Sequence, residues 1–319
     1  MTGTDPGADS GTDSASDSAT SSGRPPGTSR GSTLGALVRT ARPRQWVKNV
    51  LVFAAPVLSG RLFEGPVALD TLVAFASFSL CASGIYFLND RRDVAEDRAH
   101  PVKRHRPVAS GRLSTRTAGV AGWASLALGV ALSLLSAPAL TVTVLVYVGL
   151  SLAYCYWLKD EPLVDITLIA AGFLLRTVAG GTASDIELSE WFLLAASFGS
   201  LFMAAGKRYA EIRDPQIVLG QTRRSLGRYS ESYLRFVWTL SAGILIMTYG
   251  LWSFEERALL DSPLPVISMA PFVLAVLRYA MHVDAGDAAE PEDIALHDRG
   301  LQVLAVLWAL LVAWPLFAS

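Results

Sequence analysis

Cysteine is scarce in this chain, and its scarcity excludes two classes of protein. The 319 residues include only Cys81 and Cys155, and both lie in apolar stretches. Two isolated thiols cannot build a disulfide framework or a cysteine zinc site. Disulfide-stabilised miniproteins and zinc-finger proteins are therefore excluded, and both thiols are expected to be free and buried.

Charge is also sparse. Charged residues make up 17% of the chain against 51% hydrophobic residues, and the formal net charge is only −1. This composition is typical of polytopic membrane proteins. We therefore expect the membrane as the main partner of the chain and no nucleic-acid partner, whereas a homo-oligomer stays open.

The first 33 residues almost entirely lack large apolar side chains. Ser, Thr, Gly, Asp and Pro dominate this stretch, which cannot bury a core. It also has no apolar core of a signal peptide near its start. We expect residues 1–33 to form a disordered N-terminal tail and residues 34–319 to form a single intramembrane domain.

Long apolar runs dominate the remainder and predict an all-α, polytopic membrane helical bundle of about nine transmembrane helices. The expected spans are Trp46–Gly60, Val67–Leu88, Ala118–Leu135, Leu140–Leu158, Leu163–Gly181, Trp191–Ala205, Phe236–Trp252, Pro265–Met281 and Leu301–Phe317. The first is short and contains Pro56, so we expect it to be broken or tilted.

Arginine and lysine are concentrated in alternate loops. Residues 89–117 and 206–235 are rich in both, whereas residues 136–139 carry no charge and residues 182–190 carry only acidic side chains. Basic loops stay in the cytoplasm. We therefore expect a multi-pass protein of the plasma (inner) membrane, with its N-terminus inside and its site facing the cytoplasm. The acidic loop 284–298 is an exception to which the sequence assigns no role.

The segment from Asn89 to Asp97 carries the strongest chemical signal. Asp90, Asp93 and Asp97 follow an apolar run at offsets 0, 3 and 7, which fall within about 60° of one helix face. A solvated helix end is the plain alternative. Three carboxylates at a membrane boundary, with Asn89 beside them, instead favour a hard divalent ion that bridges to a phosphate, with all three carboxylates as catalytic metal ligands.

Cationic and polar side chains gather near other predicted span ends on the same side of the membrane. The candidate ligand-binding residues are Arg44, Lys48, Lys103, Arg106, Tyr154, Lys159, Lys207, Arg208 and Glu211. Cations beside a carboxylate–metal cluster suit a polyanionic ligand such as a diphosphate. For most basic residues of these loops, enforcement of membrane topology is the competing explanation.

Arg176 is predicted to lie inside a span, eleven residues after Asp165. A charged group in a span costs roughly 2.5–3.5 kcal/mol, so it normally faces a polar cavity. Two interpretations stay open. Asp165 and Arg176 either form a structural link through water or line a cavity together and contact a ligand phosphate.

At this point the residues resemble a known family. The pattern N-D-x-x-D-x-x-x-D at 89–97, followed by H-P-x-K-x-x-R-P at 100–107, is similar to the first acidic motif of the UbiA superfamily of intramembrane prenyltransferases. The resemblance implies binding of magnesium and a diphosphate there.

The resemblance is narrower than the superfamily. The runs 42–49, 154–181, 206–211, 233–240 and 290–293 are similar to decaprenyl-phosphate phosphoribosyltransferases of mycobacteria and their relatives. Ordinary superfamily members carry a second D-x-x-x-D motif where this chain has Lys207 and Arg208. A basic pair there favours an additional phosphate over a second metal cluster.

The resemblance implies a phosphoribosyltransferase. It would transfer 5-phosphoribose from phosphoribosyl pyrophosphate (PRPP) to a polyprenyl (decaprenyl) phosphate and release diphosphate, with Mg²⁺ as cofactor. The product would lead to the lipid-linked arabinose donor of the actinobacterial cell wall. Lys207 and Arg208 would then bind the 5-phosphate.

Two alternatives stay open. The first is an ordinary UbiA-type prenyltransferase that moves a prenyl group from a prenyl diphosphate to an aromatic acceptor, which would require a second acidic cluster. The second is a lipid or ion transporter without chemistry, which would spread charged residues through the depth of the bilayer.

Overall fold

The computed structural model describes residues 30–213 and 226–317, and within these ranges it consists of helices and connecting loops. Their bounds are α1 (Arg30–Ala41), η1 (Pro43–Phe53), α2 (Ala54–Leu58), α3 (Gly65–Arg92), α4 (Val94–Ala99), η2 (Lys103–His105), α5 (Thr115–Ser133), α6 (Pro138–Ala153), η3 (Tyr154–Leu158), α7 (Val164–Ser184), α8 (Glu190–Arg213), η4 (Leu226–Arg228), α10 (Glu231–Leu260), α11 (Leu264–Ile267), α12 (Met269–Ala285), α13 (Pro291–His297) and α14 (Arg299–Phe317). The all-α prediction is confirmed.

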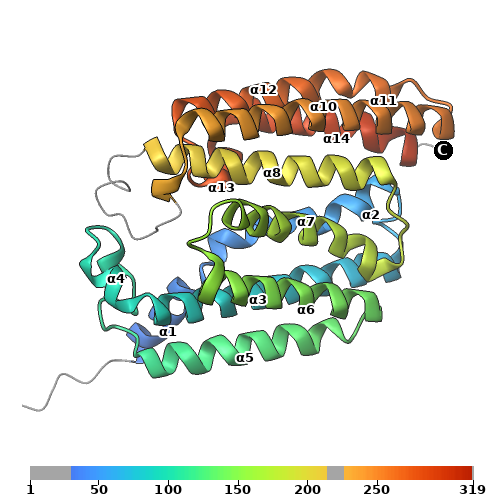
Figure 1. Cartoon of the computed structure of the whole chain (residues 1–319). Coiled ribbons are helices and arrows are strands. Elements are labelled where there is room, and N and C mark those ends of the chain that lie inside the picture. The colour runs from blue at the N-terminus through green and yellow to red at the C-terminus, as the bar shows by residue number, and fades with distance from the viewer. Residues whose placement is uncertain (1–29, 214–225, 318–319) are drawn as a thin grey trace, which may run out of the picture.

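The long helices lie side by side in one bundle (Figure 1). One half contains α3, α5 and α6, and the other contains α10, α12 and α14 (Figure 1). Helix α7 packs against both α3 and α8, and α8 packs against α10, so α7 and α8 join the two halves. The prediction of one domain over residues 34–319 is not tested by this packing and stays a prediction.

The number of membrane spans differs from the expectation. Within the described part of the chain, six helices are long and apolar enough to cross a membrane. They are Gly65–Arg92, Pro138–Leu158, Val164–Ser184, Glu231–Leu260, Leu264–Ala285 and Arg299–Leu316. These helices make the chain an integral membrane protein, but the count of about nine spans is not confirmed.

The three remaining predicted spans depart from the expectation for different reasons. The first is broken, as Pro56 predicted, into the 3₁₀ helix η1 and the five-residue helix α2. Helices α5 and α8 run alongside the other long helices (Figure 1). Polar residues at one end lower their apolar character, namely Arg116 near the start of α5 and Lys207 to Arg213 at the end of α8.

The predicted N-terminal tail is longer than the undescribed segment. Residues 1–29 lie outside the described part of the chain, whereas the last four residues of the predicted tail, 30–33, open helix α1. Helix α1 packs against α3, and the buried side chain of Ala36 belongs to a small apolar cluster with Phe87 and Val108. Helix α1 therefore includes the last four residues of the predicted tail, and the extent of that tail stays a prediction.

Small residues bring α3 and α5 unusually close together. A β-carbon on Gly84 of α3 would lie 2.8 Å from the carbonyl oxygen of Gly122 on α5. In a bilayer, helices associate largely through close contact between small residues, because lipid and side chains are equally apolar. This contact fixes α3, whose last turn carries the acidic motif.

Several elements bring their polar ends to one end of the bundle. Helices α1, α4 and α13 lie there, and the last turns of α14 lie at the opposite end (Figure 1). The acidic end of α3, the start of α7 and the basic end of α8 meet at the same end as α4 and α13 (Figure 1). The fold thus assembles one polar mouth from segments far apart in the sequence.

Candidate active site

The acidic segment is broken where the sequence predicted a continuous helix. Helix α3 ends at Arg92, and α4 begins at Val94, so Asp93 lies between the two helices. Asp90 lies on the last turn of α3 and Asp97 on α4, and both are buried. The prediction of three carboxylates on one helix face is therefore wrong, because the axis of the helix changes at Asp93.

Asp90 and Asp97 nevertheless converge on one cation. Arg106 Nη1 lies 2.8 Å from Asp97 Oδ2 and 3.4 Å from Asp90 Oδ1. A second guanidinium approaches from the N-terminal side, where Arg42 Nη2 lies 2.6 Å from Asp90 Oδ1. Arg42 adopts a left-handed backbone conformation (φ 53°) before Pro43, which turns its side chain towards α3.

Asp93 is directed to a different partner. Its Oδ1 lies 2.9 Å from Lys159 Nζ, and Glu96 lies 4.0 Å from the same ammonium. Lys159 follows η3, a π-helical turn that ends α6. Such turns are common at functional sites because the additional residue redirects the side chains that follow. Asn89 lies nearby, and its Oδ1 accepts a hydrogen bond from Cys155 Sγ at 3.5 Å.

The residues fit a magnesium ion in part. Among the described residues, no group of three His, Cys, Asp or Glu side chains is close enough to hold a metal ion. Asp90 and Asp97 share one cationic group, the guanidinium of Arg106, so both carboxylates can approach the same cation. Mg²⁺ often takes one or two carboxylates and completes its shell with water and substrate phosphate. The pair therefore fits a substrate-assisted Mg²⁺ site.

A second polar cluster is fully buried between α7 and α8. Arg208 donates to both oxygens of Asp165, from Nε and Nη2 at 2.6 Å each, and both side chains are 0% exposed. Nη2 also donates to Tyr154 Oη at 2.8 Å, and Nη1 donates to Glu211. The direct partner of Asp165 is therefore Arg208 and not Arg176, and the two interpretations of Asp165 and Arg176 stay untested.

Arg176 has neutral partners. Its Nε donates to Asn49 Oδ1 at 2.7 Å, its Nη2 donates to Tyr147 Oη at 2.9 Å, and its Nη1 donates to the Gly172 carbonyl. Within residues 30–213 and 226–317, no carboxylate forms an ion pair with this buried guanidinium. A buried charge without a counter-ion is costly, so the interior of the bundle here favours an anion.

The predicted phosphate-binding residues near the N-terminus have protein partners. Lys48 Nζ lies 3.0 Å from Glu292 Oε2, and Arg44 Nη2 lies 2.7 Å from Asp293 Oδ1. Both carboxylates belong to α13, which the sequence left without a role. Lys207, by contrast, is partly exposed at the mouth, with Glu211 Oε1 3.9 Å away.

The loop after α4 is ordered by His100. Its Nδ1 accepts hydrogen bonds from the backbone amides of Val102 and Lys103 at 3.2 and 3.4 Å. Burial and the charge of Lys103 lower the pKa of His100, so the neutral form that accepts these bonds is favoured. Lys103 begins the turn η2 and Arg106 follows it, which places both residues beside the acidic segment.

Sequence reasoning missed four residues of this arrangement: Arg42, Asn49, Tyr147 and Glu292. Arg42 and Asn49 bound the basic run 42–49, and their position beside Arg44 and Lys48 was the available signal. Tyr147 lies in an apolar span without any local signal. Glu292 opens a short acidic helix, and its contact with Lys48 joins residues too distant in sequence for a local pattern to reveal.

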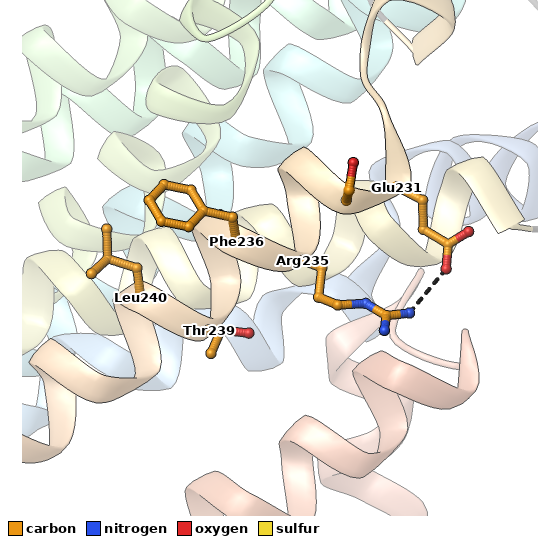
Figure 2. A pocket seen from close by; sticks show the side chains of 6 residues that line it. Glu231, Arg235, Phe236, Thr239 and Leu240 are labelled. Carbon is orange, nitrogen blue, oxygen red and sulfur yellow. Dashed lines mark hydrogen bonds and ion pairs between the residues drawn. The ribbon is translucent and has the colours of Figure 1, made fainter.

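A separate groove lies on the outer side of the bundle (Figure 2). It is lined by Glu231, Ser232, Arg235, Phe236, Thr239 and Leu240. Arg235 Nη2 lies 3.1 Å from Glu231 Oε1 across this surface (Figure 2). None of the residues predicted for the site lines the groove, so it is not part of the polar mouth.

A membrane helical bundle with acidic and basic side chains joined at one end has the features of an intramembrane transferase. The model of the UbiA prenyltransferase family matches residues 50–301, so the chain belongs to this family. Its UbiA-like fold and its activity class, a transferase, are thereby confirmed.

Two relatives narrow the comparison. A decaprenyl-phosphate phosphoribosyltransferase from Corynebacterium glutamicum is 46% identical over 287 residues, covering 88% of this chain and 86% of that protein. One from Mycobacterium tuberculosis is 48% identical over 283 residues, covering 86% of this chain and 92% of that protein.

A solved structure shares the fold. A UbiA homologue from Archaeoglobus fulgidus bound to GPP and Mg²⁺ superposes with a TM-score of 0.66 at 17% identity, covering 89% of this chain and 100% of that one. At this identity the likeness concerns the fold alone.

Proposed function

We propose that this transferase moves 5-phosphoribose from PRPP to a polyprenyl phosphate and releases diphosphate, with Mg²⁺ as cofactor. The observation that carries the proposal is the presence of two different charged environments inside the bundle. Asp90 and Asp97 converge on one cationic position, while the buried Arg176 is bonded to neutral groups and favours an anion. Two phosphate-bearing substrates require such a combination. The names of the two relatives, decaprenyl-phosphate phosphoribosyltransferases, support the same donor and acceptor.

The acidic pair accounts for the leaving group. We assign Asp90 and Asp97 to Mg²⁺, which when bound would neutralise charge on the donor diphosphate. Arg106 already lies between these carboxylates, so it can move to the diphosphate and supply bidentate hydrogen bonds there. Lys159, held beside Asp93, supplies a further positive charge.

The chemistry needs no general base. As the bond between ribose C1 and the diphosphate oxygen breaks, C1 gains positive character, and an oxygen of the acceptor phosphate forms the new bond to C1. This oxygen is already anionic at neutral pH, so no proton has to be removed. The role of Arg176, Lys207 and Lys159 is to hold two mutually repelling phosphates close together.

Arg208 contributes indirectly. Its guanidinium is bound to Asp165, Tyr154 and Glu211, so it is poorly placed to bind phosphate itself. We therefore revise the assignment of the donor 5-phosphate to Lys207, which is partly exposed at the mouth. Arg208 and Asp165 would then fix the end of α8 that carries Lys207.

We place the mouth on the cytoplasmic face of the plasma membrane, since the basic loops are at this end of the bundle. The lipid tail of the acceptor would enter sideways between apolar helices. The relatives come from Corynebacterium and Mycobacterium, which supports a role in making the lipid-linked arabinose donor of the actinobacterial cell wall.

The test is the identity of the lipid product. Protein reconstituted in lipid is incubated with Mg²⁺ and either PRPP plus polyprenyl phosphate or a prenyl diphosphate plus an aromatic acceptor. We expect mass spectrometry to detect polyprenyl-phosphoryl-5-phosphoribose in the first reaction alone. A prenylated aromatic product would establish the ordinary prenyltransferase instead, and the absence of any product would favour a transporter.

One variant tests the observation that carries the proposal. Arg176→Gln removes the buried charge, and a phosphate contact of this type is worth roughly 1.5–3 kcal/mol, or about a 10- to 150-fold loss of kcat/KM. Arg61→Gln is the control, because Arg61 pairs with Glu64 in an exposed ion pair. Equal activity of both variants would remove Arg176 from the site.

A further inference from the structure

Helix α13 lies at the site end of the bundle and contacts η1 (Figure 1). Its first turn carries Glu292 and Asp293, which pair with Lys48 and Arg44 of η1. The sequence predicted both cations as ligand-binding residues. The acidic helix α13 therefore contacts the two cations of η1 that the sequence predicted to bind ligand phosphate.

The two ion pairs differ in their surroundings. In the pair of Lys48 and Glu292, whose atoms Nζ and Oε2 lie 3.0 Å apart, the side chains are 16% and 1% exposed. In the pair of Arg44 and Asp293 the side chains are 58% and 40% exposed. Water screens the exposed pair, whereas the buried pair is screened far less. Glu292 is thus the one that acts strongly on its partner.

The buried pair is surrounded by groups from four further helices. The titratable groups that interact electrostatically with Lys48 or Glu292 are Arg176 of α7, Lys207 of α8, Tyr279 of α12, Tyr86 of α3 and Glu290 beside α13. Gln45 of η1 adds a neutral contact, since Lys48 Nζ donates to its Oε1 at 2.5 Å. Glu292 therefore lies where both halves of the bundle meet.

Burial and Arg176 lower the pKa of Lys48, and Glu292 is the main group that opposes them. Burial alone would raise the pKa of the Glu292 carboxyl, but the charges of Lys48 and Lys207 hold it below its ordinary value. Glu292 therefore favours the protonated form of Lys48, and Lys48 favours the ionised form of Glu292. Without the carboxylate, Lys48 would be a buried cation close to Arg176, which favours loss of its proton.

We propose that Glu292 is a positioning residue of the transfer reaction, which keeps Lys48 protonated and oriented so that this ammonium can bind ligand phosphate. The proposal rests on the proposed function, because it takes Lys48, which the sequence predicted as a ligand-binding residue, to contact a phosphate of those substrates. Glu292 itself does not touch the substrate. It acts through Lys48, and α13 thereby becomes part of the site.

The test compares two neighbouring carboxylates of one helix. The kcat/KM for PRPP is measured from pH 6.5 to pH 8.5 with full-length protein in lipid, for wild type, Glu292→Gln and the matched control Asp293→Asn. As the pH rises from 6.5 to 8.5, we expect kcat/KM for PRPP to fall at least about tenfold more in Glu292→Gln than in wild type. A tenfold factor corresponds to about 1.4 kcal/mol. Asp293→Asn is expected to stay within about twofold of wild type. Glu292→Asp, which keeps the charge, is expected to recover part of the loss.

A double variant tests whether Lys48 is the group whose titration causes the pH dependence. Arginine stays protonated in proteins, so Lys48→Arg combined with Glu292→Gln is expected to lose the additional pH dependence. Its persistence in this double variant would overturn the proposal. The same holds for a wild-type pH profile of Glu292→Gln, or for an equal effect of Asp293→Asn, which would show that α13 docking alone matters.

A binding measurement separates this inference from the proposed function. Calorimetry records the affinity of each variant for inorganic diphosphate in the presence of Mg²⁺ at pH 6.5 and at pH 8.5. We expect Glu292→Gln to bind diphosphate normally at pH 6.5 and more weakly than wild type at pH 8.5. If wild type forms no phosphoribosylated lipid but this binding difference is present, the proposed function fails and the role of Glu292 stands. If lipid product forms and binding shows no difference, the role of Glu292 is refuted.

Discussion

Arg208 and Asp165 form a bidentate ion pair that is closed to solvent. Nε and Nη2 of the arginine each lie 2.6 Å from an oxygen of the carboxylate, and both side chains are 0% exposed. The pair joins α8 to the first turn of α7 across the centre of the bundle. A charge buried this deeply is tolerated only while its partner is present, so the pair acts as one structural unit.

The first prediction concerns this unit. Arg208→Gln alone should destabilise the protein by about 3–5 kcal/mol, because it leaves the buried Asp165 carboxylate without a cation, whereas Asp165→Asn should cost less, because Arg208 keeps its ion pair with Glu211. The double variant should lose less than the sum of the two. Thermal unfolding in detergent measures all three, with Lys207→Gln as a partly exposed control. If Arg208→Gln unfolds like wild type and only its use of PRPP suffers, Arg208 binds phosphate directly, as the sequence first suggested.

The second prediction concerns Lys207. Substitution by Gln should lower kcat/KM for PRPP by about 10- to 150-fold, the value of one charge-assisted phosphate contact, and leave the unfolding temperature near wild type. The affinity for polyprenyl phosphate should change much less. Steady-state kinetics with each substrate varied in turn distinguish the two. An equal loss for both substrates would indicate a diffuse electrostatic effect and withdraw the 5-phosphate assignment.

The third prediction separates the carboxylates of the acidic segment. Asp97→Asn should reduce turnover at least about 100-fold and raise the Mg²⁺ concentration needed for half-maximal rate, because Asp97 shares a cation site with Asp90. Asp93→Asn should weaken donor use through Lys159 without changing that Mg²⁺ concentration. Rates measured over a Mg²⁺ titration test both. If both variants raise the Mg²⁺ concentration for half-maximal rate equally, Asp93 is a metal ligand as the sequence predicted.

The fourth prediction addresses the contact between α3 and α5. Gly84→Ala should destabilise the protein by about 1–3 kcal/mol, since the new methyl group overlaps the Gly122 carbonyl. Gly149→Ala is the matched control, because a β-carbon there meets nothing within 4 Å. Thermal unfolding should place the control at or above wild type. Similar unfolding temperatures for both variants would mean that the two helices are not held by this approach.

The acidic segment shows which structural features the local sequence pattern can predict and which it cannot. Its apolar run, its boundary and its carboxylates predicted the end of α3, and the family resemblance named the bundle. The pattern could not show the change of helix axis at Asp93, because a single-residue break leaves no periodicity to detect. One broken turn was enough to give Asp93 a different partner from Asp90 and Asp97.

Partner choice between distant segments was the least predictable property. Asp165 and Arg176 share a face of α7 at a plausible spacing, yet each bonds to another element, Asp165 to Arg208 and Arg176 to Asn49. Side-chain pairs of this kind depend on how helices pack, and packing is decided by apolar contacts along their whole length. The contact of Glu292 with Lys48 has the same origin.

The bonding of Arg176 also bears on how the protein is made. Helix α7 alone would be a poor candidate for release into lipid during synthesis, since it carries a guanidinium in an otherwise apolar segment. Its acceptors Asn49 and Tyr147, and the carbonyl of Gly172 in its own helix, all precede it in the chain. They have left the ribosome when Arg176 emerges. The nascent α7 can therefore dock on η1 and α6 as soon as it is made. Arg176 then reaches its hydrogen-bond acceptors without first being exposed to the lipid hydrocarbon.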